Sequence, residues 1–305
     1  MAEERTPLER AHRLASRQHA AISRRQALDA GLSRHEIDSL LDSRRWSRAA
    51  RGVYTVAGAP RTWHQRVSVT LLAAPSGAVA SQLTAAALFG LVKRPDVPEF
   101  TVPPTANNRR GYRSLLGDGD ICVVDGIRCT TPARTLIDCA RIVDYDTLCD
   151  LVDSALCRGL TSVTHLRRAT GRSGRKGIPV LERALEVWTW GPKPGSPPEM
   201  RLVRRLLEWG FPRPERQIRI VDDDGNLVAW VDCGWPEHRL GLEYNGDRFH
   251  GPRRWSADDT REDRIEALGW RIEPVDKFDL RPSSTRLRRL LAPLLSPRAI
   301  SVSRR

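Results

Sequence analysis

Residues 228–250, V-A-W-V-D-C-G-W-P-E-H-R-L-G-L-E-Y-N-G-D-R-F-H, contain two runs of strand-forming residues around a short polar break. The break at residues 236–239 separates runs rich in Val, Trp, Leu and Tyr, which predicts a β-hairpin. With the turn in the middle of this break, Asp232 lies opposite Glu243, with β-carbons about 4.5–5.5 Å apart. The alternation then predicts one apolar face, made of Leu227, Ala229, Val231, Cys233, Leu240, Leu242 and Tyr244.

The opposite face of this hairpin carries Asp232, Glu243 and Asn245. Two bare carboxylates this close repel each other and raise one pKa, so a cation, a proton or an arginine must neutralise them. Carboxylate oxygens are the ligands that Mg²⁺ prefers. The pair therefore predicts a divalent metal site. The alternative is a surface hairpin with two solvated acids, because short acidic motifs recur by chance.

The composition of the chain favours a nucleic-acid partner. The 305 residues carry a formal net charge of +13, and such a charge is typical of proteins that bind polyanions. Hydrophobic residues make up 40% of the chain, which is enough for a folded core. No apolar run reaches the roughly 18 residues of a membrane span, so we expect no membrane partner.

The cysteines are scattered along the chain: Cys122, Cys129, Cys139, Cys149, Cys157 and Cys233. None of them form a C-x-x-C pair, so the sequence indicates neither a zinc site nor a redox motif. Small buried thiols of this kind are typical of a protein in the reducing cytoplasm, which is the location we expect.

Residues 1–60 have the pattern of a winged helix-turn-helix. Ser23 and Ser33 are expected N-caps of two consecutive helices, joined by a turn that contains Gly31. Residues 46–56 then have the composition of a β-ribbon, which would be the wing. Basic residues on the second helix and the wing are expected to bind DNA: Arg34, His35, Arg44, Arg45, Arg48 and Arg51. The alternative is a small helical domain with a solvated basic face.

The remaining chain divides at stretches rich in Gly and Pro. We expect an α/β middle domain at residues 61–170, a linker with one helix at 171–194, and a C-terminal domain with a basic tail at 195–305. In the middle domain, residues 62–73 and 78–91 have the composition of helices. The predicted fold class of the whole chain is α+β.

The C-terminal domain shows the order α-β-β-β-α-β. Ser196 and Glu199 head a first helix, and a strand starting at Gln217 precedes the hairpin. A second helix ends before Gly269, and a fourth strand follows at residues 270–275.

This domain resembles the PD-(D/E)XK nuclease superfamily, in particular the Vsr-like branch of very-short-patch repair endonucleases, which includes a bacterial group of uncharacterised domains. The residues that carry the resemblance are Glu199, Gln217, Val231-Asp232, Leu242-Glu243-Tyr244-Asn245-Gly246, His250 and Arg261-Glu262-Asp263-Arg264 with Leu268-Gly269-Trp270. The resemblance implies a restriction-endonuclease-like αβββαβ fold and a Mg²⁺-dependent DNA endonuclease.

The family assigns roles to these residues. Asp232 and Glu243 would bind Mg²⁺, which polarises a phosphate oxygen and lowers the pKa of a bound water. Glu199 would support the metal through a water molecule, and Gln217 would lie near the site. His250 would be a general base or a phosphate contact.

Asn245 departs from the family pattern. The superfamily has Lys at this position, or in this branch often an acid. Asn can orient a water molecule but cannot take its proton or ligate a metal as a carboxylate does. Two hypotheses therefore stay open. The domain hydrolyses phosphodiesters of DNA, or it is a degenerate nuclease domain in a non-enzymatic repressor or antitoxin.

The N-terminal and middle regions resemble the AbiEi antitoxin family of AbiE toxin–antitoxin systems. The resembling motifs are Gln26-Ala27 with Gly31, Arg51-Gly52-Val53-Tyr54, Ser81 with Ala85-Ala86-Ala87 and Gly90-Leu91, and residues 131–138, T-P-A-R-T-L-I-D. The resemblance implies a winged helix that binds promoter DNA. It also implies a nucleotidyltransferase toxin, encoded by a linked gene, that is countered without a stable complex. A homodimer is an open expectation.

Overall fold

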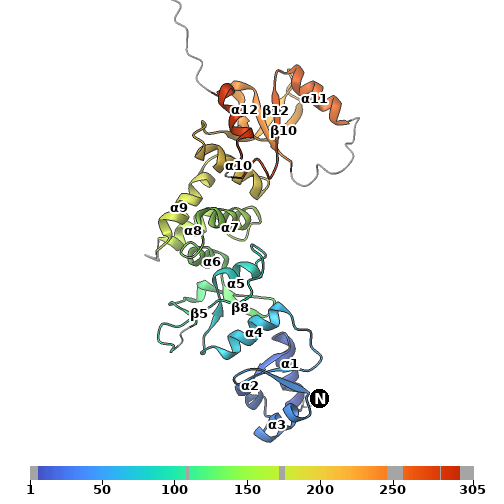
Figure 1. The fold of residues 1–305 in the computed structure, drawn as a ribbon, viewed down its shortest axis with the longest axis vertical. Coiled ribbons are helices and arrows are strands. Elements are labelled where there is room, and N and C mark those ends of the chain that lie inside the picture. Colours follow the sequence, from blue (N-terminus) through green and yellow to red (C-terminus); the bar gives the residue numbers. More distant parts are fainter. Residues whose placement is uncertain (1–5, 108–109, 172–175, 246–256, 282, 296–305) are drawn as a thin grey trace, which may run out of the picture. The chain divides into compact units, whose positions relative to one another are not determined.

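The computed structural model describes residues 6–107, 110–171, 176–245, 257–281 and 283–295 (Figure 1). Contacts divide the chain into two compact units. The first contains Met1–Asp144 and Thr164–Leu181, and the second contains Tyr145–Val163 and Glu182–Arg305. The expected domain borders stay predictions, and the contacts group Tyr145–Val163 with the C-terminal domain rather than with the middle one. In the described part of the chain, no helix is long and apolar enough to span a bilayer.

The first unit begins with a winged helix. Its elements are α1 (Pro7–Arg17), β1 (Ala21–Ser23), α2 (Arg24–Asp29), α3 (Arg34–Asp42), β2 (Trp46–Ala50) and β3 (Val53–Val56). The strands form one antiparallel sheet in the order β1-β3-β2. Ser23 and Ser33 close capping boxes at α2 and α3, in which serine and the third helical residue exchange hydrogen bonds. The predicted helix-turn-helix and wing are both present.

The wing is anchored to the core of this domain at its base. Trp46, at the start of β2, is 1% exposed and stacks on Tyr54 of β3 with ring centroids 5.8 Å apart. Both aromatic rings belong to the core that Ile37 and Leu40 of α3 complete. Because β2 and β3 begin and end in this core, the far end of the hairpin is free to carry polar residues toward solvent.

The middle region of the first unit is a five-stranded sheet with helices. Its elements are α4 (Trp63–Ala73), β4 (Val79–Ala80), α5 (Gln82–Leu88), β5 (Phe100–Val102), β6 (Tyr112–Arg113), β7 (Ile121–Val124), β8 (Ile127–Thr130), α6 (Pro132–Cys139) and α8 (Val163–Thr170). The strand order is β6-β5-β4-β8-β7. The expected helix over residues 78–91 is wrong at its start. There, Val79 and Ala80 pair with β5 and β8, and Gln82 has a φ of +48°.

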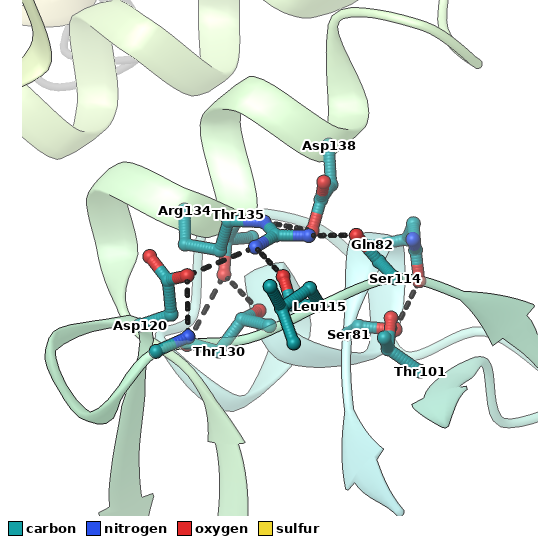
Figure 2. A network of polar contacts seen from close by, with 11 residues as sticks. Ser81, Gln82, Thr101, Ser114, Leu115, Asp120, Thr130, Arg134, Thr135 and Asp138 are labelled. Atoms are coloured by element: carbon teal, nitrogen blue, oxygen red, sulfur yellow. Dashed lines mark hydrogen bonds and ion pairs between the residues drawn. The ribbon is translucent and has the colours of Figure 1, made fainter. Parts of the chain in front are cut away.

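A buried polar network holds this sheet against α6 (Figure 2). Arg134 is 2% exposed, and its guanidinium donates to Asp138 Oδ2 at 2.8 Å, Asp120 Oδ2 at 3.1 Å and Ser114 Oγ at 2.9 Å. A buried cation is tolerated only when it is paired and hydrogen-bonded. Asp120 and Ser114 lie on the segment that leads into β7, so the network explains why T-P-A-R-T-L-I-D carries Arg134 and Asp138 four residues apart.

The second unit is built on a four-stranded sheet. Its elements are α7 (Tyr145–Cys157), α10 (Pro197–Glu208), β9 (Glu215–Val221), β10 (Leu227–Trp235), β11 (Leu240–Tyr244), α11 (Ala257–Ala267), β12 (Arg271–Val275) and α12 (Arg286–Leu295), with α9 (Ile178–Glu186) crossing the border between the units. The order is β12-β11-β10-β9, and only β11 and β12 are parallel. The α-β-β-β-α-β order expected from the sequence is present.

Two apolar clusters pack helices against the two faces of this sheet. On one face, α10 and α12 pack against Cys233 and Leu242. On the other face, Ile265 of α11 packs against Val231. The predicted hairpin register is confirmed, because Cys233 pairs with Leu242.

The expected single apolar face of the hairpin is wrong. Ala229 and Val231 belong to the cluster under α11, whereas Cys233 lies under α10 and α12. The alternation therefore breaks at Asp232. Next to this point, Gln217 in β9 has a φ of +49°, a left-handed conformation that interrupts a regular strand.

The expected basic tail is a helix over part of its length. Leu287, Leu291 and Leu295 of α12 are buried in the cluster with α10. Their spacing of four residues matches one face of a helix. This helix was not predicted from the sequence, because the arginines between the leucines made the segment read as a basic tail.

Candidate nucleic-acid interface and acidic cluster

The predicted DNA-binding side chains lie on the exposed surface of the winged helix. They occupy the start of α3, the turn after it, and the wing: Arg34, His35, Arg44, Arg45, Arg48 and Arg51. Residues 43–56 contain no acid, so the turn and the wing carry uncompensated positive charge. Such a surface can bind phosphates of a duplex.

Helix α3 itself carries more acid than base. Glu36 accepts a hydrogen bond from the backbone N–H of Ser33, and this contact lowers the pKa of its carboxyl group. Asp38 lies 3.9 Å from Arg24, which neutralises part of its charge. Asp42 ends the helix. Phosphate contacts are therefore expected mainly from the turn and the wing, while α3 is left for contacts with base edges.

Arg24 connects the helices with the wing. Its Nη1 donates to the hydroxyl of Tyr54 in β3 at 3.1 Å and lies 3.9 Å from Asp38 in α3. Tyr54 belongs to the R-G-V-Y motif of the wing. The contacts fix β3 relative to α2 and α3, so the wing arginines keep a defined position beside α3.

In the second unit, polar side chains lie near Asp232, where the alternation of β10 is interrupted. Asp232 Oδ2 accepts a hydrogen bond from the backbone N–H of Tyr244 at 2.7 Å, in place of a ladder partner. Glu199 of α10 accepts from Gln217 Nε2 at 2.9 Å. Asp232 interacts electrostatically with both Glu199 and Glu243. The structure joins Gln217 to Glu199 and Asp232 to the end of β11, and a shared site of Asp232, Glu243, Glu199 and Gln217 stays a prediction.

The electrostatics of this cluster are unfavourable for a bare carboxylate. The pKa of Asp232 is raised to about 6, mainly by burial. The hydrogen bond from Tyr244 opposes this rise, and the charges of Glu199 and Glu243 contribute to it. A raised pKa means that a bound proton or cation stabilises this site.

Arg261 of α11 supplies part of the compensating charge. Its Nη2 lies 3.7 Å from Glu243 Oε1. Both residues line a cavity of about 540 Å³, to which Asn245 also contributes. The backbone N–H of Asn245 donates to Val275 O at 2.8 Å, which places this residue at the end of β11. Of the predicted site residues, Glu243 and Asn245 line this cavity, whereas Asp232, Glu199 and Gln217 do not.

The donors of the cluster match a divalent cation in chemistry. Carboxylate oxygens are hard ligands suited to Mg²⁺. Within the described residues, however, no three His, Cys, Asp or Glu side chains are close enough together to hold a metal. Glu199 is already engaged by Gly195 N–H and Gln217, and His250 lies outside the described residues. Asp232 and Glu243 are thus the residues that would hold a cation, and this role stays a prediction.

The geometry of the first unit defines a class of protein, the winged-helix DNA-binding proteins. Residues 9–57 match a family model described as a transcriptional regulator, AbiEi antitoxin. The resemblance to AbiEi antitoxin regulators is therefore confirmed for residues 9–57, and its extension over the middle region stays a prediction.

Two curated relatives extend the similarity beyond this domain. The chain is 29% identical over 215 residues to "Uncharacterized protein MT2308" of Mycobacterium tuberculosis (strain CDC 1551 / Oshkosh), which covers 69% of this chain and 78% of that protein. "Uncharacterized protein Rv2248" of Mycobacterium tuberculosis (strain ATCC 25618 / H37Rv) has the same identity and coverage. Neither name describes an activity. The likeness of the C-terminal domain to Vsr-like nucleases stays a prediction.

Two arginines were missed as candidate site residues. Arg261 belongs to the R-E-D-R motif, which was used only to support the resemblance. An arginine on the helix that follows the hairpin can act as a counter-ion for the acids of the hairpin. Arg24 directly follows the cap Ser23, where a side chain can reach the wing. For both residues, the sequence signal that could have identified them is a basic side chain next to a predicted functional element.

Proposed function

We propose that the protein is a DNA-binding transcriptional regulator that holds duplex DNA through the turn and the wing of its N-terminal domain. The observation that carries this proposal is the exposed, acid-free row of Arg44, Arg45, Arg48 and Arg51 on a winged helix. The match of this domain to the AbiEi antitoxin regulators supports the same function.

A repression assay tests this proposal in cells. A reporter is placed under the promoter of the protein's own gene, and wild type is compared with Arg45→Ala and Arg48→Ala. Both variants are expected to lose repression, because each removes a phosphate contact. Arg128→Ala, an exposed arginine on β8, is the matched control and should repress normally. Full repression by both wing variants would refute the proposal.

The family match also supports an antitoxin role. We propose that the protein counters a nucleotidyltransferase toxin encoded by a linked gene, without forming a stable complex with it. Growth of cells that express the toxin should recover when this chain is co-expressed. No recovery, with both proteins present at detectable levels, would remove the antitoxin role and leave the regulator function untouched.

A second candidate function rests on the acidic cluster. Glu199, Gln217, Asp232 and Glu243 come from α10, β9, β10 and β11. Gln217 donates a hydrogen bond to Glu199, and Asp232 interacts electrostatically with Glu199 and Glu243. These interactions support hydrolysis of phosphodiesters in DNA. Bound Mg²⁺ would supply a polarised phosphate and an activated water. Asp232 and Glu243 would hold the ion, and Glu199 would orient water near it.

A plasmid-nicking assay separates the enzymatic from the non-enzymatic hypothesis. If the domain is a nuclease, wild type nicks plasmid with Mg²⁺ and not with EDTA, and Asp232→Asn abolishes nicking. Asp224→Asn, an exposed acid in the turn before β10, is the control and should nick normally. No cleavage by wild type with any divalent metal would make the domain a degenerate nuclease fold.

A further inference from the structure

A cavity of about 540 Å³ lies between the winged-helix sheet and α4 in the first unit. Ser47 and Thr55 of β2 and β3 form one wall, and the N-terminal half of α4 forms the other. The cavity is lined by Arg48, Arg61 and Arg66 and by no acid. Its volume is within the range of sites that bind small molecules, roughly 300–1,000 Å³.

Gln65 points to a ligand in this cavity. It lines the cavity and is only 8% exposed. Its backbone N–H is capped by Thr62 Oγ1 at 3.1 Å, but no residue in the described part of the chain forms a hydrogen bond with its side-chain amide. Its amide atoms are not fully enclosed, so a ligand in the cavity can reach the amide and accept a hydrogen bond from it in place of water.

The charges of the cavity specify an anion. Arg61 and Arg66 are exposed, and within the described chain neither guanidinium lies within ion-pair distance of a carboxylate. The N-terminus of α4, an 11-residue helix, adds its partial positive charge. Arginine side chains bind phosphate oxygens in a two-pronged geometry. The combination of arginines, hydroxyl groups and an amide donor is the chemistry of a phosphate site.

We propose that this cavity binds the phosphate group of a small phosphorylated molecule. A phosphate in a DNA backbone also fits the arginines, which are exposed. It does not fit Gln65, because a convex duplex reaches the rim of a cavity more readily than a buried amide. A small ligand satisfies both the amide and the arginines.

The site is coupled to the DNA interface through one residue. Arg48 lines the cavity and is also one of the wing arginines. A phosphate that occupies the cavity competes with duplex DNA for this guanidinium. Ligand binding is therefore expected to weaken DNA binding. This coupling rests on the proposed regulator function, whereas binding of the ligand itself does not.

Calorimetric titration of the full-length chain with sodium pyrophosphate, without DNA, tests the site. Wild type should bind pyrophosphate at a single saturable site. Gln65→Glu places a negative charge at the floor and should abolish binding, and Arg66→Ala should weaken it about tenfold or more, as expected for a charge-assisted hydrogen bond. Arg128→Ala should bind like wild type. A thermal unfolding curve confirms that each variant is folded.

Several outcomes would overturn the proposal. One is no saturable binding of pyrophosphate by wild type, and another is equal binding by wild type and a folded Gln65→Glu or Arg66→Ala. If pyrophosphate does not bind but Arg66→Ala weakens duplex binding, the cavity belongs to the DNA surface. If Gln65→Glu does not fold, pyrophosphate binding by Arg61→Ala and Arg66→Ala, two variants at exposed positions, still tests the proposal. Pyrophosphate binding without any DNA binding would refute the regulator function alone.

Discussion

At the scale of single residues, the ionised carboxylate of Asp232 destabilises the folded protein. Its pKa is about 6 in the folded protein, above the ordinary value for Asp, so folding favours the protonated form. The stabilising protonation is complete below the unfolded pKa, near 4, and is lost as the pH rises through 6. Stability should therefore fall between pH 4 and 6 from this group and stay level above it.

Replacing Asp232 should reverse this effect. Asp232→Asn keeps an oxygen to accept the Tyr244 N–H and removes the charge beside Glu199 and Glu243. We expect a gain of about 1–2 kcal/mol at pH 8, reduced from the full pKa shift because the group is partly solvated. Urea unfolding at pH 4 and pH 8 measures it. A loss of stability at pH 8, with Asp224→Asn unchanged, would contradict this account of the cluster.

At the scale of elements, two of the ion pairs between α7 and α10 differ strongly in burial and therefore in their expected contribution to stability. Arg204 and Asp153 are 6% and 1% exposed and are 2.7 Å apart, and Asp153 also accepts from Trp188 Nε1. Arg201 and Asp150 form the same kind of pair nearly half exposed. Removing one partner of a buried pair leaves an uncompensated charge, whereas an exposed pair contributes little.

This contrast gives a matched pair of variants on one helix. Arg204→Ala should destabilise the second unit by about 3–5 kcal/mol. Arg201→Ala should cost less than about 1 kcal/mol. The urea midpoint followed by tryptophan fluorescence reports both, because Trp188 contacts Asp153. Equal effects of the two substitutions would show that burial does not set the weight of these contacts.

The sequence predicted those elements whose signals are local. Capping serines at Ser23 and Ser33 and the break at residues 236–239 set the helix-turn-helix and the hairpin register correctly. It did not predict β4, because Val79 and Ala80 become a strand only by pairing with β5 and β8. That pairing depends on residues distant in the chain, which local propensity does not contain.

The candidate site shows the same division. The hairpin register was predicted correctly up to the pair Cys233 and Leu242, whereas the opposition of Asp232 and Glu243 stays a prediction. The flip of the strand face at Asp232 and the approach of Arg261 depend on packing of α11 and on the left-handed Gln217. The hairpin sequence alone contains no pattern that predicts either the change of face at Asp232 or the position of Arg261.

At the scale of the whole molecule, the basic wing and the acidic cluster belong to different units. Effects of substitutions at sites that share no partners add independently. Asp232→Asn should therefore leave duplex affinity unchanged, and Arg48→Ala should leave the pH dependence of unfolding unchanged. Fluorescence anisotropy and urea unfolding on the same preparations test this. A change of duplex affinity in Asp232→Asn would show that the second unit takes part in holding DNA.

The salt dependence of duplex binding tests the central claim, that the turn and the wing neutralise DNA phosphates. Anisotropy with the promoter duplex is measured over a range of salt for wild type, Arg48→Ala, Arg51→Ala and the control Arg128→Ala. For each wing variant, the slope of log Kobs against log salt should become shallower by about 0.9. The control should match wild type. Wild-type affinity and slope in both wing variants would contradict the account.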